Sequence, residues 1–207
     1  MKRKHAALLA LALMINAVCL TVALAAEKPK TFIAHELPKI SGSIVKVAPY
    51  ADATGNNLVL LAETDIIETG EGKRSKELSA YRYRLDKDGT IKEVWRVRDY
   101  VRDCDLDAMT ASFITDAFHI TDLDNSGTVE VWMPYVLQCA GDPGPMTMKI
   151  IMYQGTLKHA VRGKTRSRVE ANEFAGGDYT LDEEFAVRPA QFVDFARELW
   201  AKHRDRD

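Results

Sequence analysis

The segment at residues 122–130 constrains the fold of this chain more than any other. It reads Asp-Leu-Asp-Asn-Ser-Gly-Thr-Val-Glu, with oxygen-bearing side chains at loop positions 1, 3, 5 and 9 and glycine at position 6. EF-hand loops bind Ca²⁺ through the same positions and a main-chain carbonyl at position 7, because Ca²⁺ takes six to eight oxygen ligands. The spacing predicts a calcium site made by the side chains of Asp122, Asp124, Ser126 and Glu130 and by the carbonyl of Thr128.

The residues on both sides of this loop favour strands over helices. An EF-hand has a bidentate glutamate at position 12, where this chain has Met133, and residues 113–120 and 129–137 are rich in apolar, β-branched and aromatic side chains. A turn without an ion is the alternative, because Asp, Asn, Ser and Gly are common turn residues. Glu130 favours the metal, since an unpaired carboxylate would be costly in the apolar run that it opens.

This strand–loop–strand segment resembles the calcium loop of FG-GAP and VCBS repeats, in which D-x-D-x-D-G-x-x-D/E precedes a strand. Ser126 stands where those repeats usually have Asp or Asn, so the resemblance implies weaker calcium binding. Such repeats build propellers of four-stranded blades. Residues 81–97 and 148–163 also share one pattern of strand, glycine turn, Thr, apolar residue, Lys and strand. We therefore expect a mainly β fold of antiparallel, blade-like sheets, arranged as a partial propeller or like a sandwich.

The two ends of the chain differ from this β-rich middle. Residues 1–25 have a basic start, a long apolar stretch and the small-x-small sequence Ala-Leu-Ala, which is typical of a signal peptide. The alternative is an uncleaved anchor, since the apolar stretch has nearly the ~20 residues of a membrane span. We expect cleavage, no span afterwards, and a periplasmic, secreted or cell-surface protein. At the other end, residues 189–204 predict one amphipathic helix with an aromatic stripe.

Composition limits the function of the mature chain, residues 26–207, which we expect to form one domain. The whole chain has 28 basic and 30 acidic side chains, and removal of the signal peptide takes away three basic ones. The remaining acidic excess argues against nucleic-acid binding, which needs a basic surface. Cys104 and Cys139 are the only cysteines left. In an exported protein such an even pair predicts a disulfide, with two free thiols as the alternative.

The hairpin at residues 80–98 has a register that its turn predicts. A three-residue turn at 87–89 with Gly89 in the left-handed conformation would pair Tyr83 with Glu93 and Tyr81 with Trp95. The aromatic residues would then face the core and the basic residues would face water. That basic face is either a solvated surface or a binding surface for an anionic glycan or lipid headgroup, because arginine matches carboxylate and phosphate geometry. Its members are Arg82, Arg84, Lys92, Arg96 and Arg98.

Catalytic motifs do not occur in the sequence. We find no nucleophile elbow, P-loop or His-Glu-x-x-His, and no thiol paired with a base. His119 lies close to the calcium loop, but an isolated histidine in a strand is more often structural. We therefore predict no catalytic residue and expect a protein without enzymatic activity.

A second resemblance covers roughly residues 113–203. The stretches FHITDLDNSGTVEVWMPYVLQC, MTMKIIMYQGTLKHAVRG, GGDYTLDEEF and FARELWAKH are similar to a family of small exported bacterial proteins labelled surface polysaccharide biosynthesis proteins. The resemblance implies a cell-envelope setting, with a surface glycan or an envelope protein as partner. One reading is a calcium-stabilised, non-enzymatic protein that binds or helps to assemble a surface polysaccharide. The other is an enzyme that modifies or degrades envelope glycans through a site formed only in three dimensions.

Overall fold

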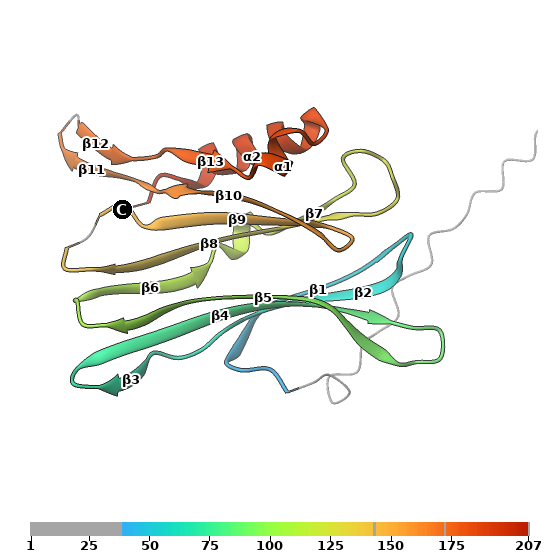
Figure 1. Ribbon diagram of the computed structural model, residues 1–207, viewed down its shortest axis with the longest axis horizontal. Helices are drawn as coiled ribbons and strands as arrows, with labels where there is room; N and C mark the ends of the chain where they lie inside the picture. The colour runs from blue at the N-terminus through green and yellow to red at the C-terminus, as the bar shows by residue number, and fades with distance from the viewer. Residues whose placement is uncertain (1–38, 143, 172, 207) are drawn as a thin grey trace, which may run out of the picture.

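The fold is described from a computed structural model at residues 39–142, 144–171 and 173–206 (Figure 1). The signal-peptide prediction for residues 1–25 lies outside these residues. The described part consists mainly of antiparallel β-sheet with a helix near its C-terminal end, which confirms the predicted fold class. Within the described part, no helix is long and apolar enough to cross a membrane.

Two antiparallel sheets make up most of the molecule. Sheet A contains β1 (Ser43–Asp52), β2 (Gly55–Glu63), β3 (Ile67–Gly70), β4 (Lys73–Leu85) and β5 (Ile91–Cys104), with β4 hydrogen-bonded to β2, β3 and β5. Sheet B contains β6 (Ala108–Phe113), β7 (His119–Thr121), β8 (Glu130–Ala140), β9 (Thr147–Gln154), β10 (Leu157–Lys164) and β13 (Tyr179–Leu181). The two regions that share a sequence pattern, residues 81–97 and 148–163, thus fall at the β4–β5 and β9–β10 hairpins.

Smaller elements complete the second half of the chain. A separate two-stranded hairpin is formed by β11 (Arg166–Glu170) and β12 (Glu173–Gly176). The helical elements are the short η2 (Thr115–Ala117), α1 (Glu183–Ala186) and α2 (Ala190–His203). Helix α2 follows Pro189 and matches the amphipathic helix that the sequence predicts.

Alternation along β8 explains why sheet B has a hydrophobic layer on each face. Val131 and Met133 point into one apolar cluster, which also contains Val59 and Ala80 of sheet A. Trp132 points to the opposite face, into a second cluster that it shares with Phe192 and other residues of α2. Successive side chains of a strand alternate between the two faces, so sheet B is sandwiched between sheet A and α2 (Figure 1).

The β4–β5 hairpin corrects the predicted register. Leu85 pairs with Ile91 and Tyr83 with Glu93, as the turn predicts. A bulge then shifts the pairing by one residue, so that Tyr81 lies opposite Arg96 rather than Trp95. A bulge moves every later side chain to the other face.

Packing between the two sheets explains this shift in register. It turns Trp95 and Val97 toward sheet B, where the ring of Trp95 stacks on Tyr153 with 4.4 Å between centroids. Tyr81 and Tyr83 are buried on the other face of sheet A, together with Leu58 and Leu60. The predicted single aromatic face is therefore divided between the two faces of the sheet.

Candidate metal-binding site

Strand pairing brings the predicted calcium loop and the end of β9 together. Residues 122–129 connect β7 to β8, and these strands pair so that Thr121 lies opposite Glu130. On the other side of β8, Glu130 lies opposite Gln154, the last residue of β9. Gly127 has φ +77° within the loop, a conformation that glycine adopts at little cost. The loop is therefore held between strands on both of its flanks.

Three carboxylates meet in this loop. Oxygen atoms of Asp122, Asp124 and Glu130 lie within 4.8 Å of one another. Glu130 is fully buried, whereas Asp122 is exposed and Asp124 is half-buried. A buried carboxylate beside two others is costly unless something compensates its charge.

Hydrogen bonds from the loop main chain orient the carboxylates. The N–H of Gly127 donates to Asp122 Oδ2 at 3.1 Å, and the N–H of Ser126 donates to Asp124 Oδ1 at 3.1 Å. Glu130 Oε2 accepts the N–H of Leu123 at 2.9 Å and the hydroxyl of Thr121 at 2.8 Å. One oxygen of each carboxylate is thereby used, and the second oxygen of Asp124 and of Glu130 faces another group, Gln154.

The amide nitrogen of Gln154 lies where most of the predicted calcium ligands converge. Its Nε2 atom is 2.8 Å from Asp124 Oδ2 and 3.1 Å from Glu130 Oε1. It is also 3.3 Å from Ser126 Oγ and 3.4 Å from the Thr128 carbonyl oxygen. A primary amide has two hydrogens to donate, so four acceptors around one nitrogen exceed what it can satisfy. Oxygens that converge on one point are also the kind of ligand that a hard cation takes, although Ca²⁺ has six to eight of them.

The carboxylates of the site are linked to a basic residue only indirectly among the described residues, through Gln154, whose Oε1 accepts a hydrogen bond from Arg188 Nη2 at 2.9 Å. Among the described residues, no lysine or arginine forms an ion pair with Asp122, Asp124 or Glu130. Burial, together with the charges of the two aspartates, raises the pKa of Glu130 despite its hydrogen bonds. Burial would also raise the pKa of Asp124, but hydrogen bonds from Gln154 and Ser126 outweigh it and lower that pKa.

The turn between β1 and β2 offers an internal comparison, because it packs directly on the calcium loop. The N–H of Ala53 donates to the Gly127 carbonyl at 2.7 Å. In this turn the oxygens of Thr54 and Asn57 surround the guanidinium of Arg82, at 2.6 and 2.9 Å from Nη2. One of the two adjoining turns thus holds a cationic side chain among its oxygens, whereas the other holds the neutral amide of Gln154, behind which lies the guanidinium of Arg188.

The position of Arg82 contradicts the predicted basic face. Arg82 is 3% exposed and lies between the sheets, because its side of β4 faces sheet B. The bulge places Arg96 on the other face, where its guanidinium stacks on Tyr81. The remaining members pair with neighbouring acids: Arg84 and Lys92 with Asp86, Arg96 with Glu93, and Arg98 with Glu77. A continuous basic surface is therefore not formed by Arg82, Arg84, Lys92, Arg96 and Arg98.

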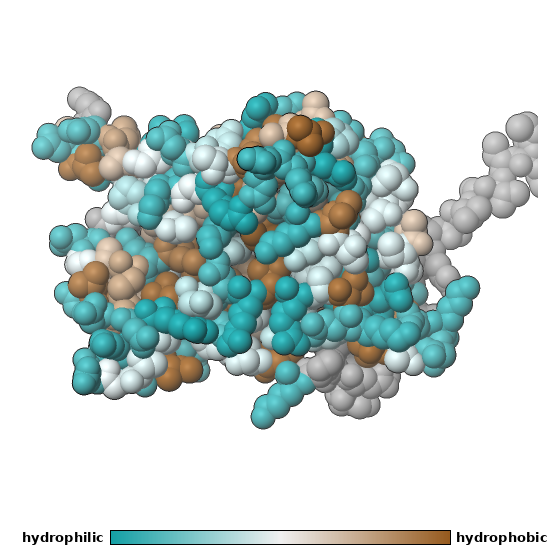
Figure 2. All heavy atoms as spheres, viewed as in Figure 1, coloured by the Kyte–Doolittle hydropathy of each residue, from teal (hydrophilic) through white to brown (hydrophobic). Residues whose placement is uncertain are grey.

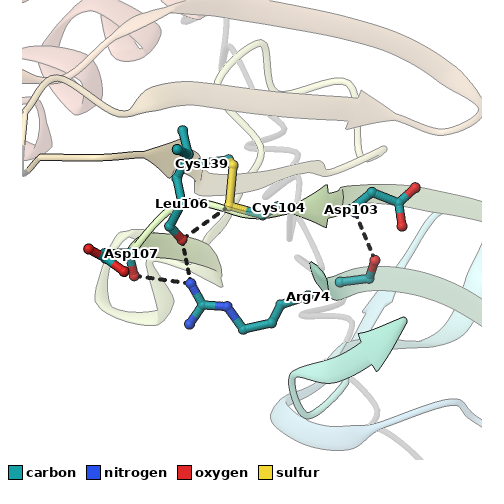
Figure 3. Close-up of a disulfide and its surroundings, with 7 residues drawn as sticks. Arg74, Asp103, Cys104, Leu106, Asp107 and Cys139 are labelled. Atoms are coloured by element: carbon teal, nitrogen blue, oxygen red, sulfur yellow. Dashed lines mark hydrogen bonds between the residues drawn. A yellow bond between two sulfur atoms is a disulfide. The ribbon is translucent and has the colours of Figure 1, made fainter. Parts of the chain in front are cut away.

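The predicted disulfide joins Cys104 and Cys139, with 5.7 Å between their Cα atoms (Figure 3). Cys104 ends β5 in sheet A and Cys139 lies near the end of β8 in sheet B. The bond therefore links the two sheets directly. Beside it, the guanidinium of Arg74 donates to the carbonyl oxygens of Leu106 and Asp107, which fixes the connection between the sheets.

His119 packs against helix α2. Its ring meets Phe195 of α2 edge-on, at 5.6 Å between centroids, and burial lowers its pKa.

The sequence does not predict Gln154 as a residue of the site, because it reaches the loop only through the pairing of β9 with β8. The one local signal is its place before Gly155, at the expected turn of a hairpin.

Comparisons of this chain with protein-family models, with curated proteins and with solved structures gave no match.

Proposed function

We propose that this protein is an exported, non-enzymatic envelope protein that binds Ca²⁺ at residues 122–130 and binds or helps to assemble a surface polysaccharide. The observation that carries the metal part is the set of four oxygens around the Gln154 amide nitrogen. The envelope and polysaccharide parts rest on the resemblance at residues 113–203 and on the signal peptide that the sequence predicts at residues 1–25.

The donor set fits a hard cation such as Ca²⁺. Asp122, Asp124 and Glu130 would supply carboxylate oxygens, Ser126 a hydroxyl and Thr128 a carbonyl. Gln154 could add an amide oxygen if its terminal amide rotated, which would exchange the nitrogen and the oxygen and would break the hydrogen bond that its Oε1 now accepts from Arg188 Nη2 at 2.9 Å. Without a cation, the Gln154 amide partly satisfies the same oxygens as a hydrogen-bond donor. The ion would place a positive charge in direct contact with the three carboxylates, of which Glu130 is fully buried.

The expected role of calcium is to stabilise the packing of the two sheets. The loop touches sheet A through the hydrogen bond from Ala53 to Gly127 and through Asp52, whose Oδ2 accepts the Val129 N–H at 3.4 Å. A cation that rigidifies the loop would therefore also hold the β1–β2 turn. A site with Ser126 in place of a third aspartate should bind in the range of extracellular modules, with Kd of ~10⁻⁴–10⁻³ M.

Thermal unfolding with Ca²⁺ and with chelator tests this proposal. At a calcium concentration of about 100 times Kd, linkage adds ~2.7 kcal/mol to the free energy of unfolding. For a chain of this size the melting temperature should rise by roughly 5–10 °C. Identical melting curves in the two buffers would overturn the calcium site.

Two variants make this test specific to the loop. Asp124→Asn should abolish the calcium-dependent shift, whereas Asp65→Asn, the same change at an exposed aspartate outside the loop, should preserve it. Gln154→Glu brings a fourth carboxylate to the same oxygens. It should lower the melting temperature in chelator and enlarge the shift on adding Ca²⁺. A shift that survives in Asp124→Asn would place the ion elsewhere.

A further inference from the structure

A cleft of about 760 Å³ lies at one end of sheet B, away from the calcium loop. Its floor is formed by β6 and β8, whose pairing sets Thr110 beside Gln138 on one face. Its wall is formed by Ser167 and Arg168 of β11 and by Arg206, which follows α2 in the chain. The volume is within the range of about 300–1,000 Å³ that small-molecule sites have.

The two charged side chains that line this cleft are both positive, although the Glu63 carboxylate accepts hydrogen bonds from two other lining residues, from the hydroxyl of Ser112 at 2.9 Å and from the N–H of Phe113 at 2.7 Å. Of its lining residues only Arg168 and Arg206 are charged, and no carboxylate lines it. This is unusual in a chain whose acidic side chains outnumber its basic ones by two. The neighbouring Arg166 is neutralised by Asp205, at 2.6 Å. Among the described residues, no acidic side chain forms an ion pair with Arg168 or Arg206.

Both guanidinium groups keep donors for a ligand. Arg168 donates from Nη1 to the Ala171 carbonyl at 3.0 Å, and Arg206 donates from Nε to the His203 carbonyl at 3.3 Å. A guanidinium has five N–H donors in a planar fork, so one such contact positions the group and leaves most of its donors unused. The fork matches a carboxylate in bidentate geometry.

The rest of the cleft suits a sugar rather than a bare anion. Thr110, Gln138 and Ser167 offer neutral hydrogen-bonding groups, while Val136 and Met146 supply apolar surface. Just beyond the cleft, hairpin β11–β12 projects from the body at the upper left of Figure 2, with hydrophilic and hydrophobic spheres side by side. This hairpin carries Phe174, a 48% exposed ring that lies against the guanidinium groups of Arg166 and Arg168, at 4.9 and 5.3 Å from its centroid. Exposed aromatic rings beside polar groups can pack against the C–H face of a sugar ring.

We propose that this cleft binds a carboxylate-bearing saccharide, with Arg168 and Arg206 on the carboxylates and the β6–β8 floor under the sugar ring. The proposal rests on the polysaccharide part of the proposed function and assigns it a site. It replaces the basic face of the β4–β5 hairpin, whose members pair with acids or are buried.

Titration calorimetry with tetragalacturonate tests the cleft, with maltotetraose as a neutral saccharide of equal length and inorganic phosphate as a simple anion. The wild-type chain should bind tetragalacturonate at least about 10-fold more tightly than either comparison ligand. Arg168→Gln with Arg206→Gln should weaken this binding by about 10-fold or more, since charge-assisted hydrogen bonds are lost. The control Arg197→Gln, at an exposed arginine of α2 outside the cleft, should bind like wild type.

Each alternative result has a definite meaning. Absence of tetragalacturonate binding, or equal binding by wild type and the double variant, overturns the cleft. Phosphate that binds as tightly as tetragalacturonate overturns the saccharide class, and maltotetraose that binds equally overturns the role of charge. The calcium proposal and the cleft proposal can fail separately. Calcium dependence is read from melting curves without any saccharide, and saccharide binding can be titrated in chelator, without calcium. Melting curves of the double variant verify that both substitutions leave the fold intact.

Discussion

Arg82 provides the sharpest test of how the two sheets are held together. Its guanidinium donates to Asn57 Oδ1 from Nε at 3.1 Å and from Nη2 at 2.9 Å. It also donates to Thr54 Oγ1 at 2.6 Å and, from Nη1, to the Gly155 carbonyl at 2.8 Å. Gly155 belongs to the β9–β10 turn of sheet B, so this one side chain joins the two sheets near the loop at residues 122–130.

The cost of removing this guanidinium follows from those contacts. Arg82→Met retains most of the apolar stem but leaves Asn57 Oδ1 without its donor, and Asn57 is fully buried. An unsatisfied buried acceptor costs about 1–3 kcal/mol, and a hydrogen bond to a charged group contributes about 1.5–3 kcal/mol. We therefore expect Arg82→Met to lower the free energy of unfolding by about 3–5 kcal/mol. This is a large fraction of the 5–15 kcal/mol typical of whole domains.

Charge reversal should affect folding differently at Arg82 and at Arg96, although the sequence predicts that both lie on one face of the hairpin. Arg82→Glu puts a carboxylate among acceptor oxygens between the sheets, and we expect this variant not to fold. The Arg96 side chain is 52% exposed, so Arg96→Glu should still fold and should lower the free energy of unfolding by only about 1–2 kcal/mol, through loss of its ion pair with Glu93 and of its contact with the Tyr81 ring.

Urea unfolding of each variant, followed by tryptophan fluorescence, measures these differences under identical buffer. The reasoning is refuted if Arg82→Met is as stable as wild type, or if Arg82→Glu and Arg96→Glu unfold at the same urea concentration. Either result would mean that the guanidinium between the sheets contributes nothing that water could not supply.

Two further predictions concern other links between the sheets. Alkylation without reductant should leave Cys104 and Cys139 unlabelled. Replacing both by serine should lower the free energy of unfolding by ~3.5–4 kcal/mol, because the disulfide closes a loop of 35 residues. Labelling of both cysteines in the oxidised wild-type chain would contradict this prediction. Asp99 Oδ2 accepts hydrogen bonds from Lys149 Nζ at 2.6 Å and from the Tyr135 hydroxyl at 2.8 Å. Burial opposes ionisation of Asp99, but these bonds outweigh it and lower its pKa. The contribution of ionised Asp99 to the free energy of unfolding is therefore present above the ordinary aspartate pKa and is lost as pH falls through the lower folded-state pKa. In Asp99→Asn, the free energy of unfolding measured in urea should fall less steeply than in wild type between about pH 5 and pH 2. Parallel curves for the two proteins would refute the assignment.

Local sequence patterns were sufficient for the elements and for much of the candidate site. Alternation and apolar runs predict strands, because side chains of a strand alternate between two faces. The amphipathic period of α2 predicts a helix that packs by one stripe, and Phe192 and Trp200 are buried as that stripe requires. The spacing of Asp122, Asp124 and Glu130 predicts that they meet, because one short loop carries all three. Each of these features depends on residues that are close together in the chain.

Tertiary structure alone decided the partners of those residues. The turn at Gly89 sets the register of the β4–β5 hairpin only as far as Tyr83, because packing of Trp95 against Tyr153 of sheet B requires the bulge. That same packing buries Arg82, which an alternating pattern places in water. Gln154 reaches the loop at residues 122–130 through the pairing of β9 with β8, and the cleft forms where β11 and Arg206 meet the edge of sheet B. In each case the deciding free energy comes from contacts between segments that are distant in sequence. Neither the hydrophobic periodicity nor the residue spacing within one segment encodes such contacts.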